Sequence, residues 1–129
     1  MPRNSIRIDK TGKLLLSEAD VQRQCIDWLE INGWRCIRTG YGEIHRNGRA
    51  VEHYGEYGMP DYLAIYYTDT GAAALVVWIE FKRPGGRGSR KGTLSTLQRV
   101  WRDVERERGA VVLVIDSLEQ LKVELRKIA

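Results

Sequence analysis

Charged side chains stand at the ends of two strand-like apolar segments of this 129-residue chain. Asp61 begins the segment DYLAIYY, Glu80 lies near the end of the segment AALVVWIEF, and Lys82 directly follows that segment. Because side chains alternate across a strand, Glu80 and Lys82 point to one face and Phe81 points to the other. An exposed Glu–Lys pair is worth only about 0 to 1 kcal/mol, so this pair alone does not indicate a function.

Asp61 adds a second carboxylate to the same place. Pro60 marks the start of the first strand, and the TDTG link is compatible with antiparallel pairing, which places that start beside the end of the second strand. Two carboxylates offer hard oxygen ligands to Mg²⁺ or Mn²⁺, and we expect the backbone carbonyl of Phe81 to complete the shell. Lys82 can stabilise charge on a phosphate, or help to position and deprotonate an attacking water.

A basic loop follows the second strand. The segment KRPGGRGSRK contains no acidic residue and carries five cations, which are Lys82, Arg83, Arg87, Arg90 and Lys91. Such a patch suits a phosphate backbone. A solvated basic loop without a ligand is the alternative interpretation.

The first helix is predicted from Ser17 to the stop at Asn32-Gly33. Ser17 and Asp20 have the spacing of a capping box. Helical spacing predicts a buried stripe made of Val21, Cys25, Trp28 and Leu29. Glu18 and Gln22 lie one turn apart beside that stripe and can point toward whatever the helix packs on, although Glu18 can equally serve only to favour the helix N-terminus.

A short strand over 34–39 and a protruding hairpin are predicted next. The hairpin segment is EIHRNGRAVEHY, because its Asn47-Gly48 pair strongly favours a two-residue turn. Its side chains include Arg46 and Arg49, together with His45 and His53. The hairpin can contact a substrate or be a polar surface feature, and the turn does not distinguish the two.

A second helix, a fully apolar strand and a third helix complete the chain. The second helix is predicted in LSTLQRVWRDVERERG, with capping-box spacing between Ser95 and Gln98 and a stop at Gly109. Its apolar stripe is formed by Leu97, Val100, Trp101 and Val104, of which Trp101 is expected to pack in the core. The strand AVVLVID and a helix capped at Ser117 follow. This order predicts an α/β fold with a mixed sheet flanked by helices.

Composition and length indicate one globular domain over residues 1–129, with a loose segment at 1–16. Hydrophobic residues make up 43% and charged residues 29% of the chain, and the net charge is +4. The longest uncharged apolar run, 72–79, is far below the roughly 20 residues of a membrane span, and no signal peptide is visible. We therefore expect a cytosolic protein whose two cysteines, Cys25 and Cys36, are buried thiols without zinc-site spacing.

The motif of Met59-Pro60-Asp61 followed by Glu80-Phe81-Lys82 resembles that of the PD-(D/E)XK nuclease superfamily. Asp and Glu-x-Lys alone are a weak motif. Together with Pro60, the Pro-Gly-Gly loop and Gln98 they form a specific one. The preceding helix, the GMPD strand, IEFKRPGG and LSTLQRVW look like the virus-type replication-repair nuclease (VRR-NUC) family, from about Ser17 to Leu121.

The resemblance implies a role for each matching residue. Asp61 and Glu80 would hold the metal, and Lys82 would be the catalytic lysine. Glu18 would reach the metal directly or through water, and Gln98 would be an active-site polar residue, with Gln22 a weaker addition. Nucleic acid would be bound by cations of the loop and the hairpin, which are Arg83, Arg87, Arg90, Lys91, Arg46 and Arg49.

The same resemblance implies a restriction-endonuclease-like core in αβββαβ order with an additional C-terminal helix. It implies hydrolysis of DNA phosphodiester bonds with Mg²⁺ or Mn²⁺, in repair or recombination in the cytoplasm of a bacterial or phage-infected cell. Small stand-alone members are expected to be homodimers that act on branched DNA such as Holliday junctions, with no nucleotide cofactor and no membrane.

Two other hypotheses remain open at this point. The chain can be a nucleic-acid-binding module without catalysis, or a restriction-like nuclease that reads one short sequence. The presence of Glu18, Asp61 and Glu80 argues against the non-catalytic module, because carboxylates repel phosphate unless a cation intervenes. Tyr41, Tyr54 and Tyr57 can pack in a dimer interface or stack on bases.

Overall fold

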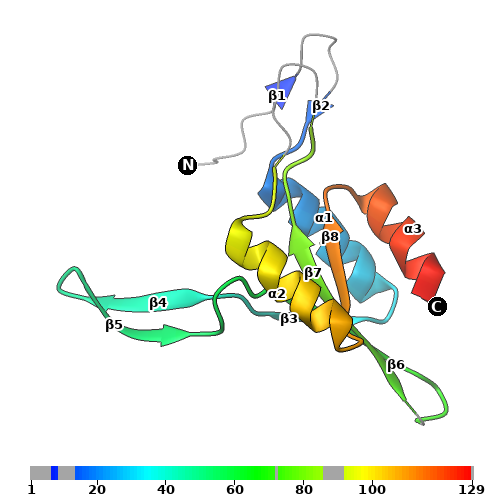
Figure 1. The fold of residues 1–129 in the computed structure, drawn as a ribbon. Helices are drawn as coiled ribbons and strands as arrows, with labels where there is room; N and C mark the ends of the chain where they lie inside the picture. Colours follow the sequence, from blue (N-terminus) through cyan, green and yellow to red (C-terminus); the bar gives the residue numbers. More distant parts are fainter. Residues whose placement is uncertain (1–6, 9–13, 72, 86–91, 129) are drawn as a thin grey trace.

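The protein folds as a four-stranded mixed sheet with helices on both faces (Figure 1). The structure is a computed structural model that describes residues 7–8, 14–71, 73–85 and 92–128. Its elements in chain order are β1 Arg7–Ile8, β2 Leu14–Leu15, α1 Glu18–Ile31, β3 Arg35–Arg38, β4 Gly42–Arg46, β5 Arg49–Tyr54, β6 Tyr62–Tyr67, β7 Ala74–Phe81, α2 Thr96–Glu107, β8 Val111–Ile115 and α3 Leu118–Ile128. The predicted α/β class with a mixed sheet is confirmed.

The strand order in the main sheet is β3-β6-β7-β8. Strand β6 runs antiparallel to β3 and to β7, as the TDTG link predicted, and Tyr62 pairs with Ile79 at the end of the β6–β7 ladder. Strand β8 is parallel to β7, which a chain can achieve only through a crossover. Helix α2 is that crossover, so it must start close to where β7 ends.

Helices α1 and α3 cover one face of the sheet and α2 covers the other (Figure 1). Strand β7 contributes side chains to the packing on both faces. On one face Val77, Ile79 and Phe81 are fully buried in the core that contains residues of α1 and α3. Trp78 points to the opposite face and meets Trp101 of α2, with ring centroids 5.1 Å apart at 75°. Trp101 therefore packs against the sheet but stays partly exposed and does not enter the buried core, contrary to the prediction.

Helix α1 has the predicted cap and buried stripe. The Ser17 hydroxyl accepts from the Asp20 N–H at 3.1 Å, and the Asp20 carboxylate accepts from the Ser17 N–H at 3.1 Å. Val21, Cys25 and Leu29 are fully buried. Packing and capping thus fix α1 with its N-terminal end, which carries Glu18, near the ends of the sheet strands.

Helix α2 has its predicted cap but not a buried stripe. Ser95 and Gln98 form a reciprocal capping box, and Trp101 packs on the sheet. Leu97, Val100 and Val104 nevertheless keep 55%, 55% and 40% of their surface exposed. The helix rests on the sheet through Trp101, so the flank that carries the other three apolar residues faces outward.

The β4–β5 hairpin projects away from the main sheet as a separate ribbon (Figure 1). Asn47 and Gly48 have positive φ angles of 54° and 76°, which is the geometry that a tight hairpin turn requires. Arg46 and Arg49 pair directly across the turn. Like charges in opposite positions destabilise a ladder, so these two arginines do not serve the stability of the hairpin.

The segment 1–16, expected to be loose, contains a short ladder in its described part, where β1 pairs with β2. Among the described residues, no helix has the length and apolar character needed to cross a membrane. Both cysteines are free thiols, as predicted. Burial raises the pKa of Cys25 to about 12 and that of the half-buried Cys36 to about 11.

Candidate active site

Asp61 and Glu80 lie side by side at the adjoining ends of β6 and β7. The ladder that pairs Tyr62 with Ile79 places the preceding Asp61 opposite the following Glu80. The Asp61 N–H donates to Glu80 Oε2 at 3.0 Å, and the Phe81 N–H donates to Asp61 Oδ2 at 3.4 Å. Each carboxylate is thus held by the backbone of the other strand.

Lys82 and Gln98 join Asp61 and Glu80 in one connected cluster, which we call the charged group. The Lys82 ammonium lies 3.4 Å from Glu80 Oε1 and donates to Gln98 Oε1 at 2.9 Å. The side-chain amide of Gln98 donates to Glu80 Oε1. The Lys82 and Glu80 side chains are only 13% and 5% exposed, so the pair is shielded from water and is more than a surface ion pair.

The electrostatics of this group disfavour a second negative charge. Burial, followed by the negative charge of Asp61, raises the pKa of Glu80 to about 8, and Lys82 only partly opposes this. Two neighbouring carboxylates repel each other when both are ionised. A bound cation would relieve that repulsion, which is the donor chemistry expected of a site for a divalent metal.

Glu18 and Gln22 approach this group from α1 in different ways. Loss of solvent raises the pKa of Glu18, while the charge of Lys82 lowers it and that of Asp61 raises it. Glu18 therefore lies within electrostatic range of the site. Gln22 donates instead to the Tyr62 hydroxyl at 3.2 Å, which ties α1 to β6 one residue from Asp61.

The carboxylates of Asp61 and Glu80 fit the usual coordination of a Mg²⁺ or Mn²⁺ ion. Within the described ranges, no group of three or more His, Cys, Asp and Glu side chains is arranged to hold a metal. Mg²⁺ commonly uses one or two carboxylates and takes its other ligands from water and substrate phosphate. Asp61 and Glu80 supply two such carboxylates. The ring of Phe81 is buried edge-on to Tyr62, on the opposite face of the strand from Glu80.

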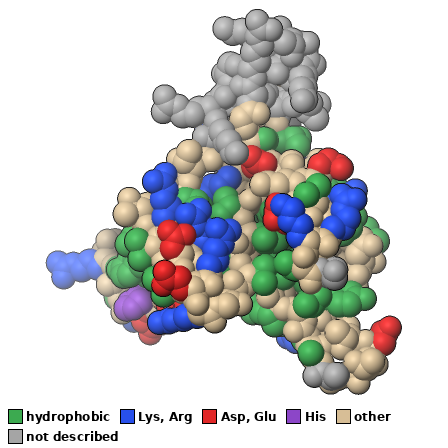
Figure 2. All heavy atoms as spheres, turned by 45° about the vertical axis from the view of Figure 1, so that its right-hand side comes forward, with side chains coloured by type: hydrophobic (Ala, Val, Ile, Leu, Met, Phe, Trp, Pro, Cys, Tyr) green, Lys and Arg blue, Asp and Glu red, His purple; other side chains and the backbone are tan. Residues whose placement is uncertain are grey.

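The structure does not bring all the predicted DNA-binding cations together. Arg83 follows Lys82 and its charge acts on Glu18, whereas Arg46 and Arg49 stand at the far tip of the hairpin (Figure 1). Arg87, Arg90 and Lys91 lie outside the described residues. Figure 2 shows a face on which basic and acidic side chains are interspersed and a band of hydrophobic side chains lies between two charged groups.

Gly58 is a positioning residue that the sequence alone did not single out. Its φ is +82°, and a Cβ there would lie 2.2 Å from the Leu97 carbonyl oxygen and 3.0 Å from the Gln98 nitrogen. The turn before Asp61 therefore touches the backbone at the start of α2. The glycine in GMPD was visible in the sequence, but its contact with a helix about 40 residues later was not.

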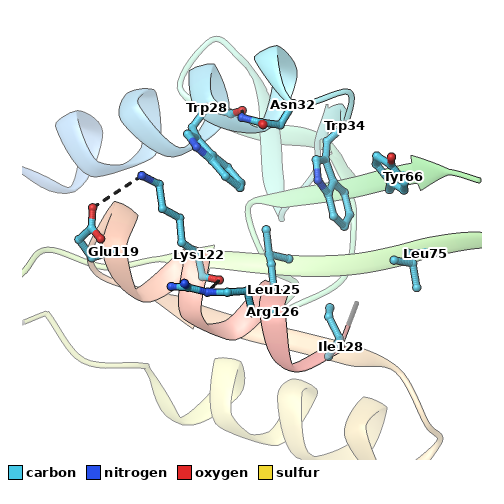
Figure 3. A pocket seen from close by; sticks show the side chains of 10 residues that line it. All are labelled: Trp28, Asn32, Trp34, Tyr66, Leu75, Glu119, Lys122, Leu125, Arg126 and Ile128. Carbon is cyan, nitrogen blue, oxygen red and sulfur yellow. Dashed lines mark hydrogen bonds and ion pairs between the residues drawn. The ribbon is translucent and has the colours of Figure 1, made fainter.

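A larger hollow lies away from these charges, between α1 and α3 (Figure 3). It has a volume of about 590 Å³ and is lined mainly by aromatic and aliphatic side chains, including Trp28, Trp34, Tyr66 and Leu75. Size alone would make it the default ligand site. The ion pair on its wall, Lys122 and Glu119, is however a loose surface contact of 3.8 Å, unlike the connected charges at Asp61, Glu80 and Lys82.

A smaller hollow of about 310 Å³ adjoins the charged group itself, and Asp61 and Gln98 form part of its wall. Its other lining residues include Tyr41, Tyr54, Tyr57 and Arg38. We call this hollow the tyrosine cavity. It gives Asp61 access to solvent and to a ligand beside it.

The arrangement as a whole can bind a cation between two carboxylates and present a shielded ammonium to an anion held there. The five residues predicted for this chemistry, Glu18, Asp61, Glu80, Lys82 and Gln98, come from α1, the ends of β6 and β7, and α2. Comparison with known proteins finds no matching family model, no matching curated protein and no matching solved structure.

Proposed function

We propose that this chain is a metal-dependent endodeoxyribonuclease of the VRR-NUC type, with a restriction-endonuclease-like core of the PD-(D/E)XK superfamily. One observation carries the proposal. Asp61, Glu80 and Lys82 converge at the adjoining ends of two antiparallel strands, and Gln98 of the next helix contacts both Glu80 and Lys82.

Each site residue has a separate role in the proposed reaction. Asp61 and Glu80 would hold Mg²⁺ or Mn²⁺ together with the Phe81 carbonyl, and Glu18 would reach the ion directly or through water. The bound ion would supply positive charge to the phosphate and make a water acidic enough to attack. Lys82 stabilises negative charge on the phosphate, because its ammonium is shielded from water. Gln98 holds the Lys82 ammonium and the Glu80 carboxylate in fixed relative positions.

Two features favour branched DNA and a homodimer, in which two sites would cut a junction on opposite strands. Helix α2 exposes an apolar stripe of Leu97, Val100 and Val104, which suits contact with a second copy. The hairpin presents Arg46 and Arg49 at its tip, at a distance from the acids that suits a second arm of a large substrate. Arg83 stands beside the charged group, where it suits contact with the DNA backbone.

Catalysis is favoured over mere binding because Glu80 is buried. A module that only binds DNA gains nothing from two adjacent carboxylates, which repel phosphate unless a cation intervenes. Burial and the charge of Asp61 raise the pKa of Glu80, so a cation beside it would favour the ionised carboxylate.

The test is cleavage of a four-way junction, a flap and a linear duplex with Mg²⁺, Mn²⁺ or EDTA. Asp61→Asn, Glu80→Gln and Lys82→Ala should each lower the cleavage rate by about 100-fold or more, the size of loss seen when a charge-stabilising group is removed. Glu80→Gln should keep the fold, because burial already disfavours the charge at this position. Lys122→Ala, a lysine of α3, is the matched control and should cleave normally.

Metal binding is measured separately from activity. Mn²⁺ should raise the melting temperature of the wild-type protein, and Asp61→Asn should abolish the rise. Undiminished cleavage by any of the three site variants would overturn the assignment. Tight DNA binding that ignores Mg²⁺, without cleavage of any substrate, would identify a non-catalytic module instead.

A further inference from the structure

The tyrosine cavity opens directly beside the proposed reacting centre. Asp61 and Gln98 belong both to its wall and to the charged group. Its volume of about 310 Å³ is at the low end of the range for ligand pockets, about 300 to 1,000 Å³. A flat group the size of one nucleobase suits this space better than a base pair does.

Two tyrosines, Tyr41 and Tyr57, contribute an aromatic part of the cavity wall. The rings of Tyr41 and Tyr57 stack, with centroids 4.3 Å apart and an interplanar angle of 26°. The Tyr41 hydroxyl hydrogen-bonds Glu43 at 2.8 Å and Tyr57 at 3.2 Å, which fixes the orientation of its ring. Tyr57 is nevertheless 63% exposed, so this fixed stack presents aromatic surface to solvent.

Backbone contacts hold that wall in place. A Cβ on Gly55 would lie 2.0 Å from the Gly40 carbonyl oxygen, and a Cβ on Gly42 would overlap the Tyr54 ring. The base of the hairpin is therefore pressed against the segment that carries Tyr41. An exposed aromatic pair held rigid in this way loses little conformational entropy when a ligand stacks on it.

We propose that the tyrosine cavity receives one unpaired nucleobase of the DNA, next to the phosphate held at Asp61 and Glu80. This inference rests on the proposed nuclease function and names the feature of the substrate that the site selects. The base stacks on the Tyr41–Tyr57 pair, since every base has an aromatic face that tyrosine can meet. Arg38, a cation on the same wall, contacts the neighbouring phosphate.

The consequence is a preference for DNA with an unpaired nucleotide at the cut. A continuous duplex keeps its bases stacked, and extracting one has an energetic cost that an already unpaired base does not incur. Flaps, gaps and branch points provide such a nucleotide. The cavity therefore accounts for structure selection without any reading of sequence.

The experiment places 2-aminopurine at successive positions across the branch point of a flap substrate, with Ca²⁺ in place of Mg²⁺. Fluorescence should be quenched at one position when wild-type protein binds. Tyr57→Leu should remove the quenching and weaken flap binding by about tenfold, within the range for loss of one stacking contact, and leave linear-duplex binding unchanged. Tyr67→Leu, an exposed tyrosine at the far end of β6, is the matched control and should behave as wild type.

A change in the DNA provides a second measurement that needs no variant. An abasic site at the quenched position should weaken wild-type binding by the same factor of about ten. Persistent quenching in Tyr57→Leu, or equal weakening of flap and duplex binding, would overturn the proposal that the cavity receives a base. If cleavage proceeds at the wild-type rate both in Tyr57→Leu and on the abasic substrate, the base-binding role of the cavity is rejected and the nuclease function is kept. Selective quenching without cleavage in Mg²⁺ would reject the nuclease and keep the cavity.

Discussion

Gln98 has two roles at the level of single residues. Its side-chain oxygen accepts from the Ser95 N–H at 2.9 Å and from the Lys82 ammonium at 2.9 Å, and its amide donates to Glu80. The same side chain thus caps a helix and holds the charged group. A helix-capping residue is identifiable from sequence spacing, but its second role depends on where β7 ends.

Gly58 determines how closely this helix approaches Asp61, and Gly58→Ala tests that contact. The substitution should destabilise the fold by about 1 to 3 kcal/mol, because φ is +82° and the new Cβ would lie 2.2 Å from the Leu97 carbonyl oxygen. Displacement of the start of α2 should also reduce cleavage. Urea unfolding and cleavage rates on a flap measure the two effects.

Gly71→Ala is the control for backbone strain alone. Gly71 has a φ of +67° with nothing within 4 Å of a new Cβ, so it should lose stability through the left-handed conformation only and cleave DNA normally. If the two variants cleave equally well, the approach of Gly58 to α2 does not position the site.

Helix caps are the element-level features that the sequence predicted best. Capping boxes at Ser17 and Ser95 both form, because the residues that make them are three positions apart and need no distant partner. The Asn47-Gly48 turn forms for the same reason. Strand pairing of β6 with β7 also followed from a short link.

Features that depend on distant contacts could not be predicted in this way. The spacing of Leu97, Val100 and Val104 indicated an apolar stripe, but only the three-dimensional packing of Trp101 on Trp78 shows that the stripe faces outward. The tyrosine cavity depends on the contact of Gly55 with Gly40, across the whole hairpin. Sequence located the acids and lysine, whereas the arrangement of the surfaces around them required the fold.

Ser95→Ala tests whether the cap of α2 also orders the site. Loss of the hydroxyl that accepts from the Gln98 N–H at 3.2 Å should reduce stability by about 1 kcal/mol. It should also lower cleavage, by up to about 100-fold, because small displacements of catalytic groups are costly. Thermal unfolding and single-turnover cleavage measure the two losses.

Ser117→Ala provides the comparison at another helix. Its hydroxyl accepts from the Gln120 N–H at 3.1 Å at the start of α3, so a similar loss of stability is expected. Gln120 accepts from the Asp116 N–H and is not among the proposed site residues, so cleavage should stay normal. Equal loss of cleavage in both variants would attribute the effect to general destabilisation.

At the scale of the whole molecule, the apolar stripe and Gln98, which belongs to the charged group, lie on the same helix, α2. Gln98 faces the sheet at the start of α2, while Val100 and Val104 face outward with 55% and 40% of their surface exposed. A two-fold interface through this stripe would bury the same side chains on both copies. It would also set the distance between two active sites, and hence the spacing of paired cuts in a junction.

A double substitution, Val100→Glu and Val104→Glu, tests this arrangement. The wild-type protein should have twice the monomer mass by light scattering, and the variant should be monomeric because four carboxylates would face one another across the interface. Val123→Glu, at a position 44% exposed on α3, should remain dimeric. The monomeric variant should still nick a flap, since each site is complete within one chain, but should lose simultaneous cuts on opposite strands of a four-way junction. A monomeric wild type, or a double variant that still dimerises, would remove the stripe from the interface and require paired cutting to arise from two independent encounters.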